Sequence, residues 1–242
     1  MKNLELFGQE TYNPFLQFGL TNDFWNINLN TIFHTWAVIV LIFFILFLTK
    51  FYLKKDNGVG QYLILSFVKS FKNQVEDSVG RFEFKYFAFI TSIFIFIFLS
   101  NIISIIPFIE EPTVDLNTTL ALGITSFLYV QINSIISNGL KNYIKEYFMP
   151  FFLLFPVNVI GTLATIVSMS FRLFGNIGGG AIIISLWHTS IGGAILFEFV
   201  GIISGMNLLL AGFFVLFEGF IQAFVFSMLP LTYLAMEVQH EE

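Results

Sequence analysis

The sequence has 242 residues, of which 56% are hydrophobic and 11% are charged, and its mean hydropathy is +0.82. A soluble domain needs roughly a quarter of its residues charged to keep its surface hydrated. The composition therefore excludes a soluble globular protein and predicts an all-α integral membrane protein. The net charge of −5 argues against nucleic acid as a partner. Because the sequence contains no cysteine, disulfides, thiolate metal sites and cysteine nucleophiles are excluded within this chain.

The first half of the chain is expected to cross the bilayer three times. Residues 1–30 are polar and aromatic, with no basic flank before a short apolar core, so we expect an external segment and no signal peptide. A crossing helix needs about 20 apolar residues. The segments that meet this requirement are 31–49, 86–106 and 116–136.

Residues 50–85, between the first two crossings, are predicted to contain an amphipathic helix on the membrane surface. Apolar residues recur there near helical spacing, and charged residues occupy the other faces. The apolar positions are Leu63, Phe67, Phe71 and Val75.

Two longer apolar tracts, 148–187 and 191–236, complete the single membrane domain expected over residues 1–242. A helix of about 40 residues extends about 60 Å, which is twice the thickness of the hydrocarbon core. We therefore expect the two tracts to form a long, steeply tilted hairpin.

The basic residues predict the orientation of the chain. Seven of the 11 Lys and Arg residues lie in the segment 50–85, and Lys141 and Lys145 precede the hairpin. The positive-inside rule places both regions on the cytoplasmic side. Five crossings then leave the N-terminus outside and the C-terminus inside. Apart from Lys2, topology leaves only Arg172 among the basic residues unexplained.

Arg172 is interpreted as the working centre of an ion pathway. An arginine at the centre of a lipid-exposed helix costs at least about 2.5–3.5 kcal/mol, and it cannot lose its proton. Its guanidinium must therefore face a polar cavity, an acidic partner or another subunit, unless it snorkels to an interface. Ser168 and Asn176, four residues before and after it, extend a polar stripe along the same helix face.

Further candidates for the pathway lie along the hairpin. Glu218 and Gln222 are four residues apart, and a carboxylate within the membrane can exchange protons or form a static ion pair with Arg172. Near the turn, Glu198 either lines a water-filled mouth or is solvated. Ser185 and His188 lie near the outer end of the first tract, where an interfacial role is the alternative for the histidine. The sequence contains no metal-site or phosphate-loop motif, so we expect no metal and no cofactor.

Three segments carry a family resemblance. They read PTVDLNTTLAL (112–122), SFRLFGNIGGG (170–180) and GFIQAFVFSMLPLTYL (219–234). On these segments, and over nearly its whole length, the chain resembles subunit a of F-type ATP synthases. The resemblance implies a proton-translocating, non-catalytic stator subunit of the Fo sector, without a nucleotide site of its own. The implied partners are the c-subunit ring, subunit b of the peripheral stalk, the whole F1Fo complex and the lipid membrane.

The resemblance also implies roles for individual residues. Arg172 would face the ring between two offset half-channels, Gln222 would be its neighbour on the last helix, and Asn176 would line the site. Two positions that are often ionisable in the family are Ala181 and Val215 here. We expect Glu218 to supply the missing carboxylate of the outer half-channel. The motifs, particularly DLNTT, resemble bacterial or plastid members of the family more than animal mitochondrial ones. We expect the plasma membrane of a bacterial cell, with an organellar inner or thylakoid membrane as the less favoured alternative.

Two other functions compete with this one. A secondary transporter that binds an anionic substrate through Arg172 would predict inverted repeats, and we find no convincing repeat in the sequence. A non-catalytic subunit of a respiratory complex would give no reason for two helices that are too long to cross upright.

Overall fold

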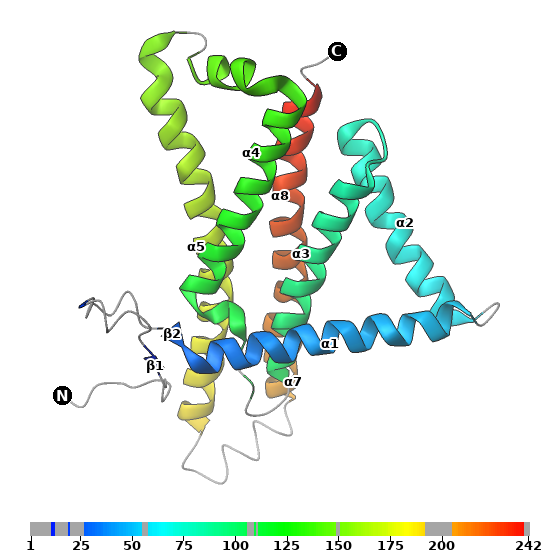
Figure 1. Ribbon diagram of the computed structural model, residues 1–242. Helices are drawn as coiled ribbons and strands as arrows, with labels where there is room; N and C mark the ends of the chain where they lie inside the picture. The colour runs from blue at the N-terminus through cyan, green and yellow to red at the C-terminus, as the bar shows by residue number, and fades with distance from the viewer. Residues whose placement is uncertain are drawn as a thin grey trace.

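The computed structural model describes residues 11–12, 19, 27–54, 58–105, 109, 111–148, 151–191 and 205–239. Among these residues, five helices are long and apolar enough to cross a membrane, which confirms the all-α membrane class. A pair of two-residue strands, β1 (Thr11–Tyr12) and β2 (Ile27–Asn28), precedes them. The helices are α1 (Leu29–Leu53), α2 (Val59–Val79), α3 (Phe84–Ile102), α4 (Leu116–Tyr147), α5 (Phe155–Ile191), α7 (Met206–Ala211) and α8 (Gly219–Gln239) (Figure 1). Shorter elements are the 3₁₀ turns η3 (Ile103–Ile105), η4 (Pro112–Val114) and η5 (Phe152–Leu154) and the π-helix η6 (Gly212–Glu218).

Helix α1 runs across the direction of α3, α4, α5 and α8 (Figure 1), and its main contacts are with α2, α3 and η4. It begins at Asn28, whose Oδ1 accepts a hydrogen bond of 3.0 Å from the backbone nitrogen of Asn30 and so caps the helix. The helix is apolar on all sides, and only 11% of its most apolar stretch is buried within the chain. Its surface is therefore left to lipid or to other subunits.

The apolar face predicted for helix α2 is only partly buried in the structure. Phe71 and Val75 are buried in the core and Phe67 packs against it, whereas Leu63 is 61% exposed. The buried half of this face packs on α3 and α8. Gly80 ends the helix in the left-handed conformation, with φ of 81°, which favours glycine at this position.

The core of the chain forms between α3 and α8, which make the most extensive contact of any two helices described. Tyr86, Ile90 and Ile97 of α3 are fully buried there. They belong to one cluster with Phe226 and Leu234 of α8. The last helix is therefore held from both sides, by α3 and by α4.

Helix α4 is interrupted at Gly139, where φ is 76° and ψ is 147°. These angles are open to glycine and strained for other residues. Residues 140–147 consequently turn away from the helix axis, as the upper end of α4 shows in Figure 1. This turn brings Tyr143 and Tyr147 back over the space between α4 and α5.

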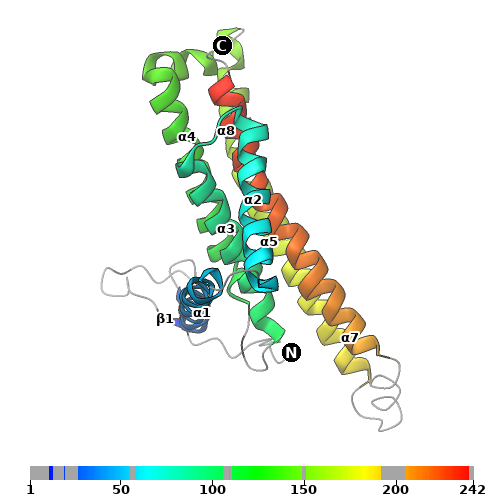
Figure 2. The same ribbon diagram turned by 90° about the vertical axis from the view of Figure 1, so that its right-hand side faces the viewer.

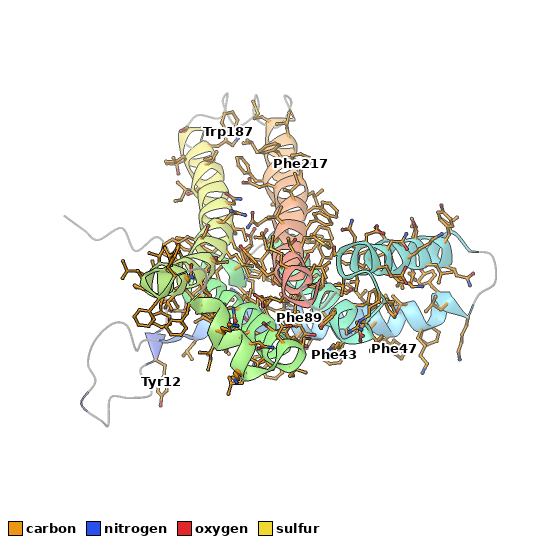
Figure 3. The ribbon with its side chains drawn as sticks, turned by 90° about the horizontal axis from the view of Figure 1, so that it is seen from above. Tyr12, Phe43, Phe47, Phe89, Trp187 and Phe217 are labelled. Carbon is orange, nitrogen blue, oxygen red and sulfur yellow. The ribbon has the colours of Figure 1, made fainter. Side chains whose placement is uncertain are left out.

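Helix α5 and the run α7–η6–α8 lie side by side (Figure 2). Figure 3 shows Trp187 on α5 and Phe217 on η6 toward the same end of this pair. A Cβ atom at Gly180 would lie 3.0 Å from Cδ1 of Phe214, so the glycine permits the close approach of η6 to α5. Residues 192–204 join the two arms and lie outside the described residues.

Candidate functional site

A hydrogen bond joins the two arms of the hairpin near their middle. Nδ2 of Asn176 on α5 donates to Oε1 of Gln222 on α8 at 2.8 Å. Gln222 is buried, at 3% exposure, and Asn176 is half-buried. These are two of the residues expected from the sequence to lie beside Arg172, and the structure brings them together.

Arg172 lies one helical turn before Asn176 on α5, and its side chain is exposed. It lines a pocket of about 290 Å³ together with Ser168 and Thr165 of the same helix and Tyr233 of α8. Of the polar stripe expected from the sequence, Ser168 and Arg172 border this hollow between α5 and α8, whereas Asn176 is not in its lining. The spacing of four residues places Ser168, Arg172 and Asn176 on one face of the helix.

Arg172 forms no ion pair with a carboxylate within the described part of the chain. The ion pairs found there join Lys72 to Glu76, at 3.3 Å, and Arg81 to Glu83, at 3.1 Å. The static pair between Arg172 and Glu218 that the sequence left open is therefore not formed. A guanidinium exposed on a membrane-crossing helix still requires a polar or acidic neighbour.

Glu218 is the last residue of the π-helix η6 and is partly buried. The next residue, Gly219, accepts a hydrogen bond of 3.1 Å at its backbone oxygen from Nδ2 of Asn101 on α3. Oγ1 of Thr113 donates to Oδ1 of Asn101 at 3.2 Å. π-Helical turns are rare and frequently lie at functional sites, and no periodicity in the sequence predicts this one.

The remaining candidates are spread along the hairpin. Ser185 is exposed on α5, 13 residues after Arg172. His188 belongs to α5, but its side chain is outside the described part of the structure. Glu198 falls in the segment 192–204, which is also outside it. Their expected places in the pathway stay predictions.

Two features of the site were missed from the sequence. Glu237, near the end of α8, accepts a hydrogen bond from Ser134 of α4 at 2.5 Å. It lines a second pocket, to whose lining the segment after Gly139 contributes Tyr143 and Tyr147. The Asn–Gly pair at 138–139 is a turn signal that could have marked the break in α4, whereas nothing local in the sequence joins Ser134 to Glu237.

The loop between α3 and α4 carries a perturbed carboxyl group. Burial raises the pKa of Glu111 from its ordinary value of 4.5 to about 7, against a smaller opposing effect from a hydrogen bond with Ser104. Asp115, at the start of α4, accepts hydrogen bonds from the backbone nitrogen of Asn117 at 2.9 Å and from Oγ1 of Thr31 at 3.2 Å. The loop is therefore tied both to α4 and to α1.

Fold and site together define a polytopic helical membrane protein with an exposed arginine on α5 that forms no ion pair among the described residues. A family model described as the ATP synthase A chain matches residues 32–235. The chain is 34% identical over 206 residues to ATP synthase subunit a of Moorella thermoacetica, covering 85% of this chain and 89% of the relative. It is 31% identical over 231 residues to ATP synthase subunit a 2 of Acaryochloris marina, covering 94% and 91%.

The chain belongs to the ATP synthase subunit a family. A third relative, ATP synthase subunit a of a Hydrogenobaculum species, is 34% identical over 187 residues, covering 75% of this chain and 84% of the relative. Proton translocation by the membrane sector Fo is the general function of this family, and its members are part of the F1Fo complex. The chain is accordingly a multi-pass membrane protein of Fo, and the transporter alternative is not favoured.

Proposed function

We propose that this chain conducts protons as the stator subunit that faces the c-subunit ring, with Arg172 between two offset half-channels. The observation that carries this proposal is the exposed guanidinium of Arg172, which forms no ion pair among the described residues of a membrane-crossing helix. A carboxylate on a neighbouring subunit would supply the partner that such a charge needs. The ring carboxylate is that partner.

The surface of α5 supports a helical partner beside Arg172. A Cβ atom added at Gly175, Gly178 or Gly179 would meet nothing within 4 Å inside the chain. Only 11% of the most apolar stretch of α5 is buried. Small residues at the surface of a membrane helix let a second helix approach closely. The face that carries the arginine is thus open to the ring.

A fixed positive charge at this place has two effects on protons. It favours the deprotonated form of a ring carboxylate in front of it and so promotes proton release there. It also makes direct passage of a proton between the half-channels costly, because a second positive charge would have to pass Arg172. Rotation of the ring is then the pathway with a low barrier for moving the proton between the half-channels. One charge moving through 100 mV supplies about 2.3 kcal/mol.

We assign the remaining candidate residues to the passage on either side of this charge. Asn176 and Gln222, hydrogen-bonded at 2.8 Å, would line the passage beside Arg172. Glu218 would serve as the carboxylate of the outer half-channel, in place of an ionisable residue at Val215 or Ala181. Ser168, Ser185, His188 and Glu198 complete the proposed proton pathway.

The arrangement of helices fits a tilted hairpin. Helix α1 has 25 residues, or about 37 Å at 1.5 Å per residue, which suits an upright crossing. Helix α5 has 37 residues, or about 55 Å. Because α3, α4, α5 and α8 all run across the direction of α1 in Figure 1, an upright α1 would incline all four of them, the hairpin included, to the bilayer normal. We place the N-terminus outside and the C-terminus in the cytoplasm of a bacterial cell, with subunit b as a further partner.

The proposal is tested in the reconstituted F1Fo complex by replacing Arg172 with alanine. We expect ATP synthesis and ATP-driven proton pumping to fall at least 100-fold, because the ring carboxylate loses its counter-charge. The matched control is Arg81→Ala, which removes an exposed arginine outside the crossing helices. Coupled synthesis retained by Arg172→Ala would overturn the proposal. Glu218→Gln separately tests the outer half-channel, and unchanged pumping would remove Glu218 from it.

A further inference from the structure

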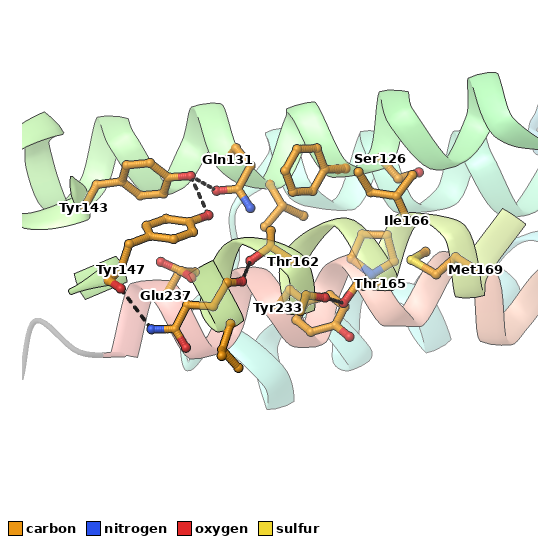
Figure 4. Close-up of a pocket in the computed structure, with 16 residues that line it drawn as sticks. Ser126, Gln131, Tyr143, Tyr147, Thr162, Thr165, Ile166, Met169, Tyr233 and Glu237 are labelled. Carbon is orange, nitrogen blue, oxygen red and sulfur yellow. Dashed lines mark hydrogen bonds between the residues drawn. The ribbon is translucent and has the colours of Figure 1, made fainter. Parts of the chain in front are cut away.

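Helices α4, α5 and α8 enclose a pocket of about 590 Å³ that is distinct from the hollow beside Arg172 (Figure 4). Its walls carry hydroxyl, amide and carboxylate groups in a part of the chain that is otherwise apolar. The polar residues in the lining are Ser126, Gln131, Tyr143, Tyr147, Asn158, Thr162, Thr165, Tyr233 and Glu237. The pocket has room for water beside these polar groups, since one molecule needs about 10–15 Å³ and two to four polar partners.

This pocket continues toward Arg172. Four residues, Gly161, Thr165, Met169 and Tyr233, line both the large pocket and the smaller one that contains the arginine. The two hollows are therefore consecutive along α5. A chain of waters entering at Glu237 would need to pass only this shared wall to reach the guanidinium.

Glu237 is the carboxylate of the large pocket, and it is held in place from α4. Oγ of Ser134 donates to its Oε2 at 2.5 Å, and Nδ2 of Asn138 donates to its backbone oxygen at 3.1 Å. The other ionisable groups in the lining are the phenols of Tyr143 and Tyr147 from α4 and Tyr233 from α8, with Arg172 in the adjoining pocket.

The segment after Gly139 lies at one end of the pocket and indicates which side of the membrane this end faces. In this segment the hydroxyl of Tyr143 donates to Oε1 of Gln131 and lies 2.9 Å from that of Tyr147. Nδ2 of Asn158 donates to the backbone oxygen of Tyr147 at 2.9 Å. This segment also carries Lys141 and Lys145. Lysines flanking crossing helices mark the cytoplasmic side.

We propose that this pocket is the water-filled vestibule of the cytoplasmic half-channel and that Glu237 is its proton-exchanging carboxylate. The inference rests on the proposed function of Arg172. A proton that leaves the ring in front of Arg172 passes through water to the carboxylate of Glu237, which becomes neutral. The Glu237 carboxyl group then gives the proton to water at the mouth and returns to the carboxylate. In the opposite direction the same two transfers run in reverse.

The first test replaces Glu237 in the intact complex. Glu237→Gln keeps an oxygen that can accept from Ser134 but cannot carry a proton, so we expect ATP-driven pumping to fall at least fivefold. Glu237→Asp restores a carboxylate and is expected to recover most of the rate. If Arg172→Ala abolishes pumping but Glu237→Gln leaves it unchanged, this inference alone is overturned. Pumping retained by Arg172→Ala would instead overturn the proposed function.

The second test measures access to the pocket and does not depend on the stability of the Glu237 variants. Because the chain has no cysteine, Thr162→Cys places its one thiol in the pocket wall. In inside-out vesicles, a cationic, impermeant methanethiosulfonate is expected to inhibit pumping by this variant. Leu163→Cys is the matched control, since Leu163 is exposed and lines neither pocket. The vestibule is contradicted if the reagent, applied from the cytoplasmic side, does not inhibit pumping by Thr162→Cys. It is also contradicted if the reagent inhibits both variants equally.

Discussion

The side-chain amide of Asn101 on α3 holds the backbone oxygen of Gly219, 118 residues further along the chain, at 3.1 Å. Gly219 is the residue at which the π-helix η6 gives way to α8. Asn101 and Thr113, which hydrogen-bonds to it, are buried, at 1% and 0% exposure. The position of Glu218, one residue before this junction, is therefore fixed by a buried contact with the core helix.

Replacing Asn101 with alanine should destabilise the chain. The change removes the donor to Gly219 and the acceptor of Thr113 in a buried setting, which costs about 1–3 kcal/mol. Thermal unfolding of the purified chain in detergent measures this loss. Asn117→Ala, at an exposed asparagine at the start of α4, serves as the control and should leave the midpoint unchanged. Equal midpoints for the two variants would show that the Asn101 contact contributes nothing.

The contact between α4 and α5 depends on Gly123. A Cβ atom there would lie 2.2 Å from Oγ of Ser170 and 3.4 Å from the backbone oxygen of Ile166. Gly123→Ala should therefore destabilise the chain by about 1–3 kcal/mol through overpacking. The same change at Gly161, where a Cβ meets nothing within 4 Å, should be tolerated. Combining Gly123→Ala with Ser170→Gly should recover much of the loss, and failure to recover it would place the strain elsewhere.

The hydrogen bond between Asn176 and Gln222 should appear as coupling in a double-mutant cycle. Asn176→Ala and Gln222→Ala each remove one partner, so the double variant should lose less stability than the sum of the two. We expect a coupling energy of about 0.5–1.5 kcal/mol. The cycle is measured from unfolding midpoints of the four chains under one condition. Strict additivity would mean that the two side chains do not interact in the membrane protein.

The buried carboxyl of Glu111 should make stability depend on pH. Its pKa is raised from 4.5 to about 7 because burial disfavours the charged form. The folded chain then binds more protons than the unfolded chain between these values. The stability that the neutral group retains below pH 4.5 is accordingly lost as the pH rises through about 7.

We expect this loss to be about 1–3 kcal/mol between pH 4.5 and pH 8, and to disappear in Glu111→Gln. Unfolding midpoints across this range, compared with those of the unchanged chain, measure the difference. Asp77→Asn, at an exposed carboxylate on α2, is the control and should keep the pH dependence. A Glu111→Gln chain that still loses the same stability would assign the effect to another group.

Much of the helical architecture follows from the composition of each segment. Apolar runs of sufficient length predict the crossings, because backbone groups in lipid must be satisfied within a helix. Arg172 stands out by charge alone, and helical spacing alone places Ser168 and Asn176 beside it. These features are local, so a sequence displays them directly.

Other parts of the site depend on contacts that no local pattern encodes. The approach of Ser134 to Glu237 joins residues 103 positions apart, and that of Asn101 to Gly219 arises from the packing of α3 on α8. The absence of a pair between Arg172 and Glu218 likewise depends on how η6 turns, since helical spacing gives no distance between two different helices. Tertiary packing, which decides all three, is not readable from periodicity.

The wide turns of η6 also affect how positions are matched between relatives. On a helical wheel drawn at 3.6 residues per turn, residues seven positions apart, such as Val215 and Gln222, point in nearly the same direction. Turns closed by bonds from i to i+5 contain one more residue than α-turns. A chain that lacks one residue before Gly219 can therefore lose a π-turn and leave α8 where it is. In such a relative, positions from Gly219 onward would match those of this chain, whereas positions before Gly219 would be displaced by one.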